Sequence, residues 1–233
     1  MGEDQNKTGQ ELILYNYFRS STSYRVRIAL ELKKLSYTYK PVHLLKNGGD
    51  QNQTEYRTIN PLGGVPTLVH RDKILSQSLV ILEYLDDAFP ETYQLFYSEN
   101  DFQKAKMKQF CEIINADMHS FGNLKLLQYL EKKHGYTTAE KEAWVQHWFA
   151  DGLISLEQIA SNFAEKFCFG SRLTAADALL VPLFLTAERF KVNLTAYPTL
   201  YRVHQTCLEQ PEFIQAHPHR QIDTPEELRN LKV

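Results

Sequence analysis

The sequence predicts a protein of two domains, an α/β domain at residues 11–90 followed by an all-helical domain at residues 101–233. Three observations support this division. Short strand-like and helix-like segments alternate as far as Pro90, residues 91–100 lack periodicity and are typical of a linker, and long amphipathic segments follow. A chain of 233 residues is long enough to bury a substantial core in one large domain or two modest ones.

The composition is that of an ordinary globular protein, and it excludes several classes. A formal net charge of −2 argues against a general binder of nucleic acids or anionic membranes, because such binders need a basic surface. The polar first ten residues show no secretory signal, and no apolar run is long enough to span a bilayer. The three cysteines are widely spaced and odd in number, which favours reduced thiols and a cytoplasmic location: Cys111, Cys168 and Cys207.

The first domain shows the element order strand–helix–strand, then strand–strand–helix. The β-prone segments are 12–17, 37–44, 67–69 and 74–75, and the helical segments are 24–35 and 79–89. A polar loop is expected at 46–58, and Pro90 ends the last helix. A parallel strand pair joined by a helix, closed by a hairpin and a final helix, is the thioredoxin-like arrangement.

The second domain contains amphipathic segments at roughly 101–133, 138–165, 174–190 and 198–209. Thr174 and Asp177 have the spacing of a shortened capping box at the start of the third segment. A carboxylate in an apolar run invites a catalytic interpretation. We assign Asp177 to folding instead, because the capping box explains it.

The first motif with chemical potential is Ser20-Ser21-Thr22, which lies between a predicted strand and the first helix. A helix start offers unpaired amide N–H groups and a partial positive charge, and both lower the pKa of a bound thiol. A hydroxyl at the same place can donate a hydrogen bond to a sulfur anion. The same residues are also ordinary N-caps. The motif contains no Cys-x-x-Cys pair, which disfavours a dithiol redox enzyme.

Two further motifs lie at helix and strand starts in the same domain. A cis bond at Val65-Pro66 would expose the Val65 backbone to an added peptide strand, whereas a trans bond would make it an ordinary loop, and the sequence leaves both open. Gln77-Ser78 precedes a helix whose N-terminus can hold a carboxylate, or simply be capped by Ser78. Three such motifs in one thioredoxin-like pattern favour a binding site.

These residues carry a resemblance to a known family. The chain resembles the glutathione transferases, and among them the zeta class, which includes the maleylacetoacetate isomerases. The run Ser-Ser-x-Ser-x-Arg-Val-Arg-Ile-Ala-Leu at residues 20–30 is specific to that class, whereas Val-Pro and Gln-Ser mark glutathione-binding folds in general. The matching stretches, between about Leu12 and Leu228, are 17–30, 60–68, 77–85, 187–194, 197–199 and 220–225.

The resemblance implies roles for individual residues. Ser20 matches the serine that activates the glutathione sulfur, with Ser21 and Arg19 beside it as further catalytic residues. Val65 would pair with the cysteinyl backbone next to a cis Pro66, and Gln77 and Ser78 would hold the γ-glutamyl carboxylate. Gln51 would contact glutathione near its glycine end, and Arg19 and Arg189 match arginines that bind the carboxylates of the substrate.

The resemblance also implies an activity. Glutathione thiolate would add to the cis double bond of maleylacetoacetate, and rotation followed by loss of the thiol would give fumarylacetoacetate, a step of tyrosine and phenylalanine catabolism. This chemistry needs a depressed thiol pKa and cations for the substrate carboxylates. Glutathione would be regenerated and so act as a cofactor. The resemblance further implies a homodimer acting on a small diacid, and we expect no metal.

Departures from the family pattern leave the substrate open. Thr22 stands where the class commonly has cysteine, and threonine also occurs there in glutathione-dependent maleylpyruvate isomerases. In the stretch 117–125, which resembles the pocket-lining stretch of both groups, His119 and Asn123 remain candidates for substrate contact, and Gly122 suggests a bend. Maleylpyruvate is therefore the nearest alternative substrate, followed by small α-halo acids for a transferase or dehalogenase. A binding protein of this fold without catalysis is a remote alternative.

Overall fold

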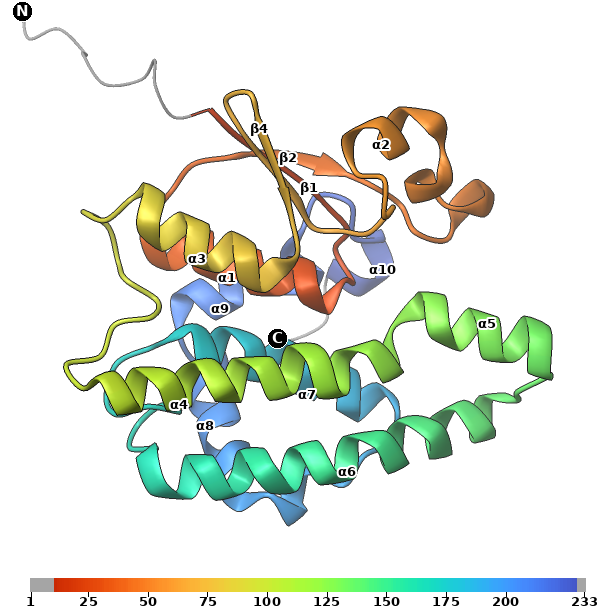
Figure 1. Ribbon diagram of the computed structural model, residues 1–233. Helices are drawn as coiled ribbons and strands as arrows, with labels where there is room; N and C mark the ends of the chain where they lie inside the picture. The colour runs from red at the N-terminus through yellow and green to blue at the C-terminus, as the bar shows by residue number, and fades with distance from the viewer. Residues whose placement is uncertain (1–10, 230–233) are drawn as a thin grey trace, which may run out of the picture. The chain divides into compact units, whose positions relative to one another are not determined.

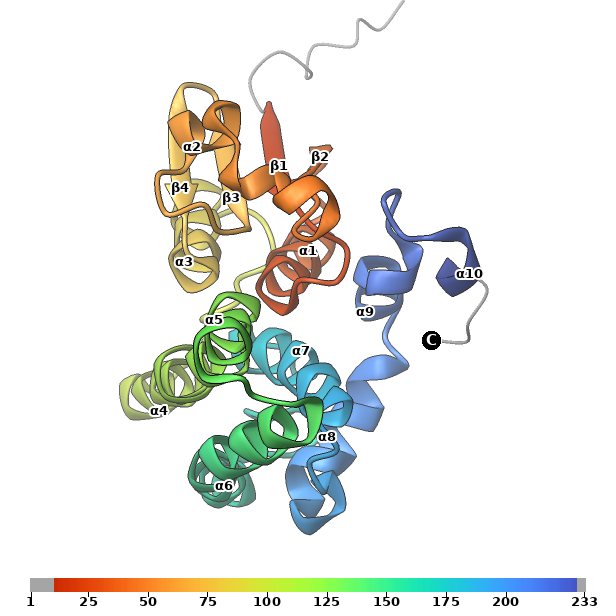
Figure 2. The same cartoon turned by 90° about the vertical axis from the view of Figure 1, so that its right-hand side faces the viewer.

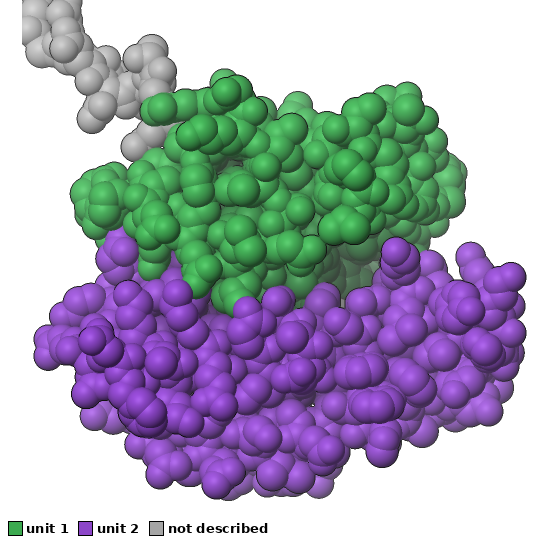
Figure 3. Space-filling model, viewed as in Figure 1, with its two compact units in different colours: residues 1–92, 215–233 green, residues 93–214 purple. Residues whose placement is uncertain are grey.

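The computed structural model describes residues 11–229, which fall into two compact units. Of the described residues, one unit contains 11–92 and 215–229, and the other contains 93–214, as coloured green and purple in Figure 3. The sequence-based division placed residues 215–233 in the helical domain, whereas the contacts of residues 215–229 group them with the first unit.

The first unit is built on a mixed four-stranded sheet of order β2-β1-β3-β4. Strand β1 pairs in parallel with β2, and β3 pairs antiparallel with both β1 and β4, so that Leu14 lies between Tyr39 and Leu68. Helices α1 and α3 lie side by side against one face of the sheet (Figures 1 and 2). The elements are β1 (Leu12–Asn16), α1 (Ser21–Lys33), β2 (Thr38–Pro41), β3 (Thr67–His70), β4 (Lys73–Ser76) and α3 (Ser78–Ala88). This is the predicted thioredoxin-like architecture.

The expected polar loop over residues 46–58 instead contains secondary structure. Two short 3-10 turns (Lys46–Gly48 and Asp50–Asn52) are followed by helix α2 (Thr54–Ile59). The helix carries few apolar residues, so periodicity does not reveal it. Tyr56 anchors it, because this ring is only 6% exposed and is the buried residue of α2.

Buried polar groups join the C-terminal segment to the first unit. Arg27 of α1 is fully buried and donates to the carbonyls of Ala216 (2.9 Å) and Phe18 (3.0 Å). Asp223 accepts hydrogen bonds from the Phe18 amide (3.0 Å) and from the Tyr39 hydroxyl. Because a buried guanidinium must have its donors satisfied, the segment after residue 214 is held where it supplies the Ala216 carbonyl to Arg27. This segment includes the end of α9 (Pro211–Ala216), a 3-10 turn (Pro218–Arg220) and α10 (Glu226–Arg229).

The second unit is all-helical, with α7 at its centre. Most residues of α7 are buried, and α4, α6 and α8 all pack against it. The expected helix over 101–133 is interrupted, because α4 passes into a π-helix and a 3-10 turn before α5 begins. The elements are α4 (Asp101–Glu112), the π-helix (Ile113–Met118), the 3-10 turn (His119–Gly122), α5 (Leu124–His134), α6 (Thr138–Phe163), α7 (Ala175–Arg189), a second 3-10 turn (Leu194–Ala196) and α8 (Pro198–Leu208).

The irregular segment after α4 packs closely against α6. A Cβ added to Gly122 would lie 3.1 Å from the Phe149 ring, and one added to Gly152 would lie 2.5 Å from the Met118 sulfur. Two glycines therefore allow the irregular segment to approach α6 closely. Irregular turns of this kind are frequent next to functional sites.

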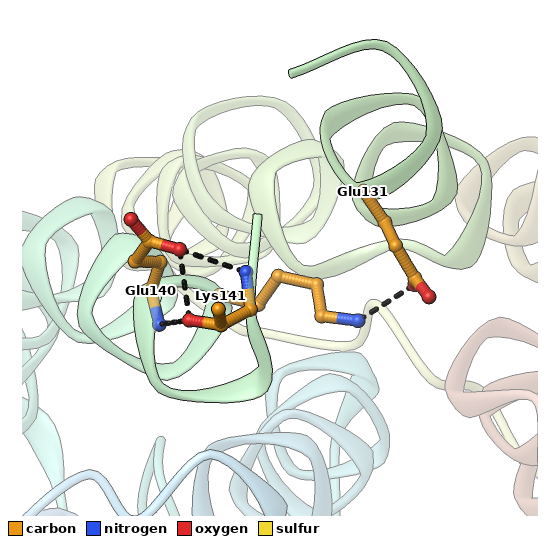
Figure 4. Close-up of polar contacts among 4 residues, drawn as sticks. Glu131, Glu140 and Lys141 are labelled. Carbon is orange, nitrogen blue, oxygen red and sulfur yellow. Dashed lines mark hydrogen bonds and ion pairs between the residues drawn. The ribbon is translucent and has the colours of Figure 1, made fainter. Parts of the chain in front are cut away.

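Two capping boxes fix helix starts in this unit. Asp177 accepts from the Thr174 amide and hydroxyl (both 2.8 Å) and from the Cys168 amide (2.8 Å), which confirms its predicted structural role. At the start of α6, Glu140 accepts from the Thr137 amide and hydroxyl, and Figure 4 also shows the ion pair between Lys141 and Glu131 at 2.7 Å. Within residues 11–229 no helix is long and apolar enough to cross a membrane.

Candidate functional site

The first part of the candidate site is the N-terminus of α1, which Ser20 caps. Its backbone is extended (φ −72°, ψ 120°), and its Oγ accepts a hydrogen bond from the Ser23 amide at 3.1 Å. The amides of Ser21 and Thr22 have no hydrogen-bond partner within the described part of the chain. A helix N-terminus with two open N–H donors is suited to an anion such as a thiolate. The capping and functional interpretations of Ser20 are therefore compatible.

Thr22 connects this helix start to the loop before β3. Its Oγ1 donates to the Val65 carbonyl at 2.9 Å and lies 2.9 Å from the Ser20 Oγ. The Val65–Pro66 peptide bond is cis, which settles the alternative that the sequence left open. The Val65 N–H precedes β3 and is unpaired among residues 11–229, so it is available to an extended peptide ligand.

A buried polar network holds the loop before β3, which contains Val65. Asn60 donates from Nδ2 to the Gly64 carbonyl and to the Thr67 hydroxyl, both at 3.0 Å. The Tyr56 hydroxyl also bonds the Gly64 carbonyl and lies 2.9 Å from the Thr67 hydroxyl. Burial raises the pKa of Tyr56, so this side chain remains a neutral donor. The backbone of Val65 is thus held by contacts on both sides of it.

The second part of the site is the N-terminus of α3. Gln77 precedes the helix in a positive-φ conformation (φ 75°, ψ 112°), which is uncommon for a residue other than glycine and is often found at functional sites. Ser78 is the first residue of the helix, and its Oγ accepts a hydrogen bond from Nη1 of Arg25 at 3.2 Å. The guanidinium can only donate, so the Ser78 hydrogen remains free to donate to a ligand.

The charge beside Ser78 is buried. Arg25 is 1% exposed and Ser78 is 2% exposed. A hydroxyl donor, a helix N-terminus and a buried cation together favour a carboxylate at this position. These residues fit the γ-glutamyl carboxylate that the resemblance implied for Gln77 and Ser78.

Gln51 has a different environment from the one expected. Its Nε2 donates to the Leu44 carbonyl at 3.1 Å, and its Oε1 is buried without a hydrogen-bond partner among the residues described. The side chain lies over Gly49, where an added Cβ would come within 2.3 Å of Nε2. Both polar atoms of Gln51 are therefore turned inward, and its contact with glutathione stays a prediction.

The residues expected to contact substrate include Arg19, which is exposed after β1 in the first unit, and three residues of the second unit. His119 is half-buried in the 3-10 turn after the π-helix. Asn123 caps α5, because its Oδ1 accepts from the Leu126 amide at 2.9 Å. Arg189 is exposed at the end of α7, with its guanidinium 4.8 Å from the centre of the Phe190 ring.

An open groove of about 590 Å³ runs along α5 in the second unit. Asn123 and Ser120 lie at one end of it, and three lysines give it a basic edge: Lys125, Lys132 and Lys133. His119 and Arg189 are not among its lining residues. The structure therefore assigns Asn123 a structural bond and a place at a groove, and the substrate contacts remain predictions.

The cysteines take no part in this chemistry. All three are buried, and burial raises the pKa of the Cys168 and Cys207 thiols. Since position 22 carries threonine, any reactive thiol must come from a ligand. The described residues also contain no cluster of side chains able to hold a metal ion.

Comparison with known proteins identifies the family. The family model of the glutathione S-transferase N-terminal domain matches residues 10–87, and that of the C-terminal domain matches residues 149–211. The chain is 40% identical over 212 residues to a probable maleylacetoacetate isomerase of Vibrio cholerae, covering 91% of this chain and 98% of that protein. The chain belongs to the zeta class of the glutathione transferases.

Solved structures of zeta-class proteins have the same fold. A bacterial maleylpyruvate isomerase superimposes with a TM-score of 0.86 at 34% identity, covering 91% of this chain and 100% of that one. A maleylacetoacetate isomerase of Methylobacterium extorquens AM1, solved with bound malonate and glutathione, gives a TM-score of 0.84 at 31% identity, covering 91% and 99%. That Methylobacterium protein therefore binds glutathione together with a small dicarboxylate.

Sequence reasoning missed three contributors to the first unit's site. Nothing in the sequence neighbourhood of Arg25 marks its side chain as buried. Tyr56 lies in the stretch 46–58 that was expected to be a polar loop, and Asn60 follows this stretch. Both side chains support the Val65 loop. For Asn60, the resemblance of the stretch 60–68 to the family is the signal that the sequence offers.

Proposed function

We propose that this zeta-class protein catalyses the glutathione-dependent cis–trans isomerisation of maleylacetoacetate to fumarylacetoacetate. The observation that supports this most is the α1 N-terminus, where Ser20 and two open amides are linked through Thr22 to Val65, whose N–H is unpaired among the described residues. When bound, glutathione supplies a thiolate that adds reversibly to the cis double bond, so that the bond can rotate. The residues of this chain bind glutathione, stabilise its thiolate and bind the carboxylates of the substrate.

Residues of the first unit are assigned to two parts of glutathione, the γ-glutamyl carboxylate and the cysteinyl backbone. The Ser78 hydroxyl, with Arg25 behind it, receives the γ-glutamyl carboxylate. The Val65 N–H pairs with the cysteinyl backbone, which sets the position of the sulfur. The α1 N-terminus and the Ser20 hydroxyl then favour the charged form of that sulfur, because both interactions are stronger with an anion than with a neutral thiol.

Cations are required for the carboxylates of the substrate. We propose Arg19 and Arg189 for this role, because both are exposed and arginine binds carboxylates in a bidentate way. Replacing Arg189 with methionine should raise KM more than it lowers kcat. The matched control is Arg202→Met, an exposed arginine on α8, and equal effects of the two substitutions would contradict the role of Arg189.

Maleylpyruvate is the second candidate substrate. Two observations favour it, namely Thr22 and the similarity in fold to a maleylpyruvate isomerase. This substrate is a shorter diacid with the same cis double bond, so the chemistry proposed for the first unit would be unchanged.

The deciding experiment compares kcat/KM for maleylacetoacetate and maleylpyruvate, each with and without glutathione. Turnover of one maleyl substrate that depends on glutathione supports the proposal, and the larger kcat/KM identifies the substrate. Binding to immobilised glutathione without turnover of either substrate would point to a binding protein, or to a transferase of small α-halo acids. Equal rates without glutathione would refute the mechanism. The same assay applied to Ser20→Ala tests the role of Ser20. Its control is Ser36→Ala, at an exposed serine after α1.

Two broader expectations accompany this function. Dependence on glutathione suits the cytosol, where this thiol is abundant, and the resemblance to zeta-class enzymes implies a homodimer. Sedimentation of the purified protein tests the dimer, and fractionation of the source cells tests the compartment.

A further inference from the structure

The hydrogen bonds around Thr22 have a defined direction. The Val65 carbonyl can only accept, so the single hydroxyl hydrogen of Thr22 is directed to it over 2.9 Å. The 2.9 Å contact between the Thr22 and Ser20 oxygens must then be donated by Ser20. The Ser20 Oγ in turn accepts from the Ser23 amide. The chain of donors therefore runs from Ser23 to Ser20, then to Thr22, and then to Val65.

This order leaves the Ser20 hydrogen engaged. In the structure it is directed to Thr22 and not toward the two open amides of the α1 N-terminus. A negatively charged sulfur bound at those amides is a stronger acceptor than a neutral hydroxyl. A neutral thiol or a thioether sulfur is a weak acceptor. Ser20 thus has two possible acceptors, and the charge on the sulfur decides between them.

We propose that Thr22 is a positioning residue that holds the hydrogen of Ser20 whenever the sulfur of bound glutathione is uncharged, and releases it when the sulfur becomes a thiolate. The proposal rests on the glutathione site proposed above, but not on the identity of the maleyl substrate. The Ser20 hydrogen alternates between two acceptors, and no covalent bond forms or breaks in this switch. The bond from Thr22 to Val65 keeps the Thr22 oxygen aimed at Ser20 throughout.

Under this proposal, loss of the Thr22 hydroxyl lowers the pKa of the bound thiol instead of raising it. In the wild type, ionisation of the bound thiol breaks the bond from Ser20 to Thr22, and this opposes ionisation. Replacing Thr22 with valine keeps the β-branched shape but removes the competing acceptor. The pKa of the bound thiol should therefore fall, by about 0.7 unit if the lost bond contributes about 1 kcal/mol. A purely structural role for Thr22 predicts the opposite, because a loosened site would let the thiol pKa rise toward that of free glutathione.

The test measures the pKa of the bound thiol, from the ultraviolet absorbance of the thiolate, in wild-type protein and in three variants. Thr22→Val should lower this pKa, and Thr22→Ser should leave it within about 0.2 unit of wild type, because serine retains the hydroxyl. Ser20→Ala should raise it. Adding Thr22→Val to Ser20→Ala should then cause no further fall, because Ser20 has no hydrogen left to release. A rise with Thr22→Val, or an equal fall in both backgrounds, would overturn the proposal.

Two further measurements separate this result from other failures. S-methylglutathione has no ionisable thiol, so its affinity depends on the hydrogen bond from Thr22 to Val65 and not on the charge of the sulfur. Thr22→Val should weaken this affinity by about fivefold. If wild-type protein bound no glutathione at all, the proposed function would fall first. The Ser20–Thr22 link would then be tested in the free protein by a double-mutant cycle of unfolding free energies. Additive effects of Ser20→Ala and Thr22→Val in that cycle would overturn the inference.

Discussion

His204 should make the second unit sensitive to acid. It lies on α8, is 1% exposed, and its ring centre is 4.9 Å from that of Phe184 on α7. Both ring nitrogens are buried and lack a hydrogen-bond partner within residues 11–229. Burial lowers the pKa of His204 to about 4, because the charged imidazolium would lose its hydration without gaining a partner.

The size of the effect follows from this pKa. The unfolded chain binds a proton at His204 as the pH falls through 6.5, whereas the folded protein binds it only near pH 4. His204 therefore leaves the free energy of unfolding unchanged above pH 6.5, and lowers it progressively as the pH falls from 6.5 to about 4. The difference between 6.5 and about 4, at about 1.4 kcal/mol per unit, amounts to about 3 kcal/mol.

The assay is urea unfolding of wild type and His204→Leu at a series of pH values from 7.5 to about 4.5. Leucine removes the orphaned ring nitrogens, so the variant should be at least as stable as wild type at neutral pH. The advantage of the variant should then grow by about 2 kcal/mol on acidification to pH 5. His134→Leu, at an exposed histidine ending α5, controls for the loss of a histidine. Parallel pH curves for wild type and His204→Leu would refute the reasoning.

Four further predictions concern binding, turnover and stability. Ser78→Ala should weaken glutathione binding by roughly tenfold to a hundredfold in calorimetry, because a hydrogen bond to a carboxylate is lost, and S-methylglutathione should be affected equally. An unchanged affinity would remove Ser78 from the site. Ser20→Ala should lower isomerase kcat far more than Thr22→Ala, and equal losses would contradict the role of Ser20. Asp177→Ala should lower the free energy of unfolding by about 3 kcal/mol or more, since buried amides lose their acceptor. Thr137→Ala removes an exposed cap and should lower the free energy of unfolding by only about 1 kcal/mol. A loss as large as that of Asp177→Ala would contradict the argument that burial makes Asp177 the more important cap.

The motifs of the candidate site could be found from sequence because each depends on local geometry. Ser20 and Ser78 were noticed as hydroxyls at helix starts, and the structure places them at the starts of α1 and α3. The Thr174 and Asp177 pair was recognised by its spacing, and its hydrogen bonds confirm the capping box. Such features involve residues a few positions apart, and local backbone preferences determine them.

The contacts behind those motifs could not be found in the same way. Arg25 reaches Ser78 across 53 positions of sequence, and Arg27 reaches the Ala216 carbonyl across 189. Both arginines are buried, against the usual preference of charged side chains for the surface. Their partners exist only once the sheet, α1, α3 and the C-terminal segment have packed together.

The sequence by itself determined the order of the four strands and of helices α1 and α3 in the first domain, its thioredoxin-like architecture, and the hydroxyl-rich helix start at Ser20-Ser21-Thr22. Tertiary structure alone decided what those hydroxyls do. Thr22 and Val65 are 43 positions apart, and only folding brings the threonine hydroxyl within 2.9 Å of the Val65 carbonyl. Since a hydroxyl has one hydrogen to donate, that single distant acceptor sets the direction of the bond between Ser20 and Thr22. Local sequence fixes which groups are present at a helix start, and long-range packing fixes where their hydrogens are directed.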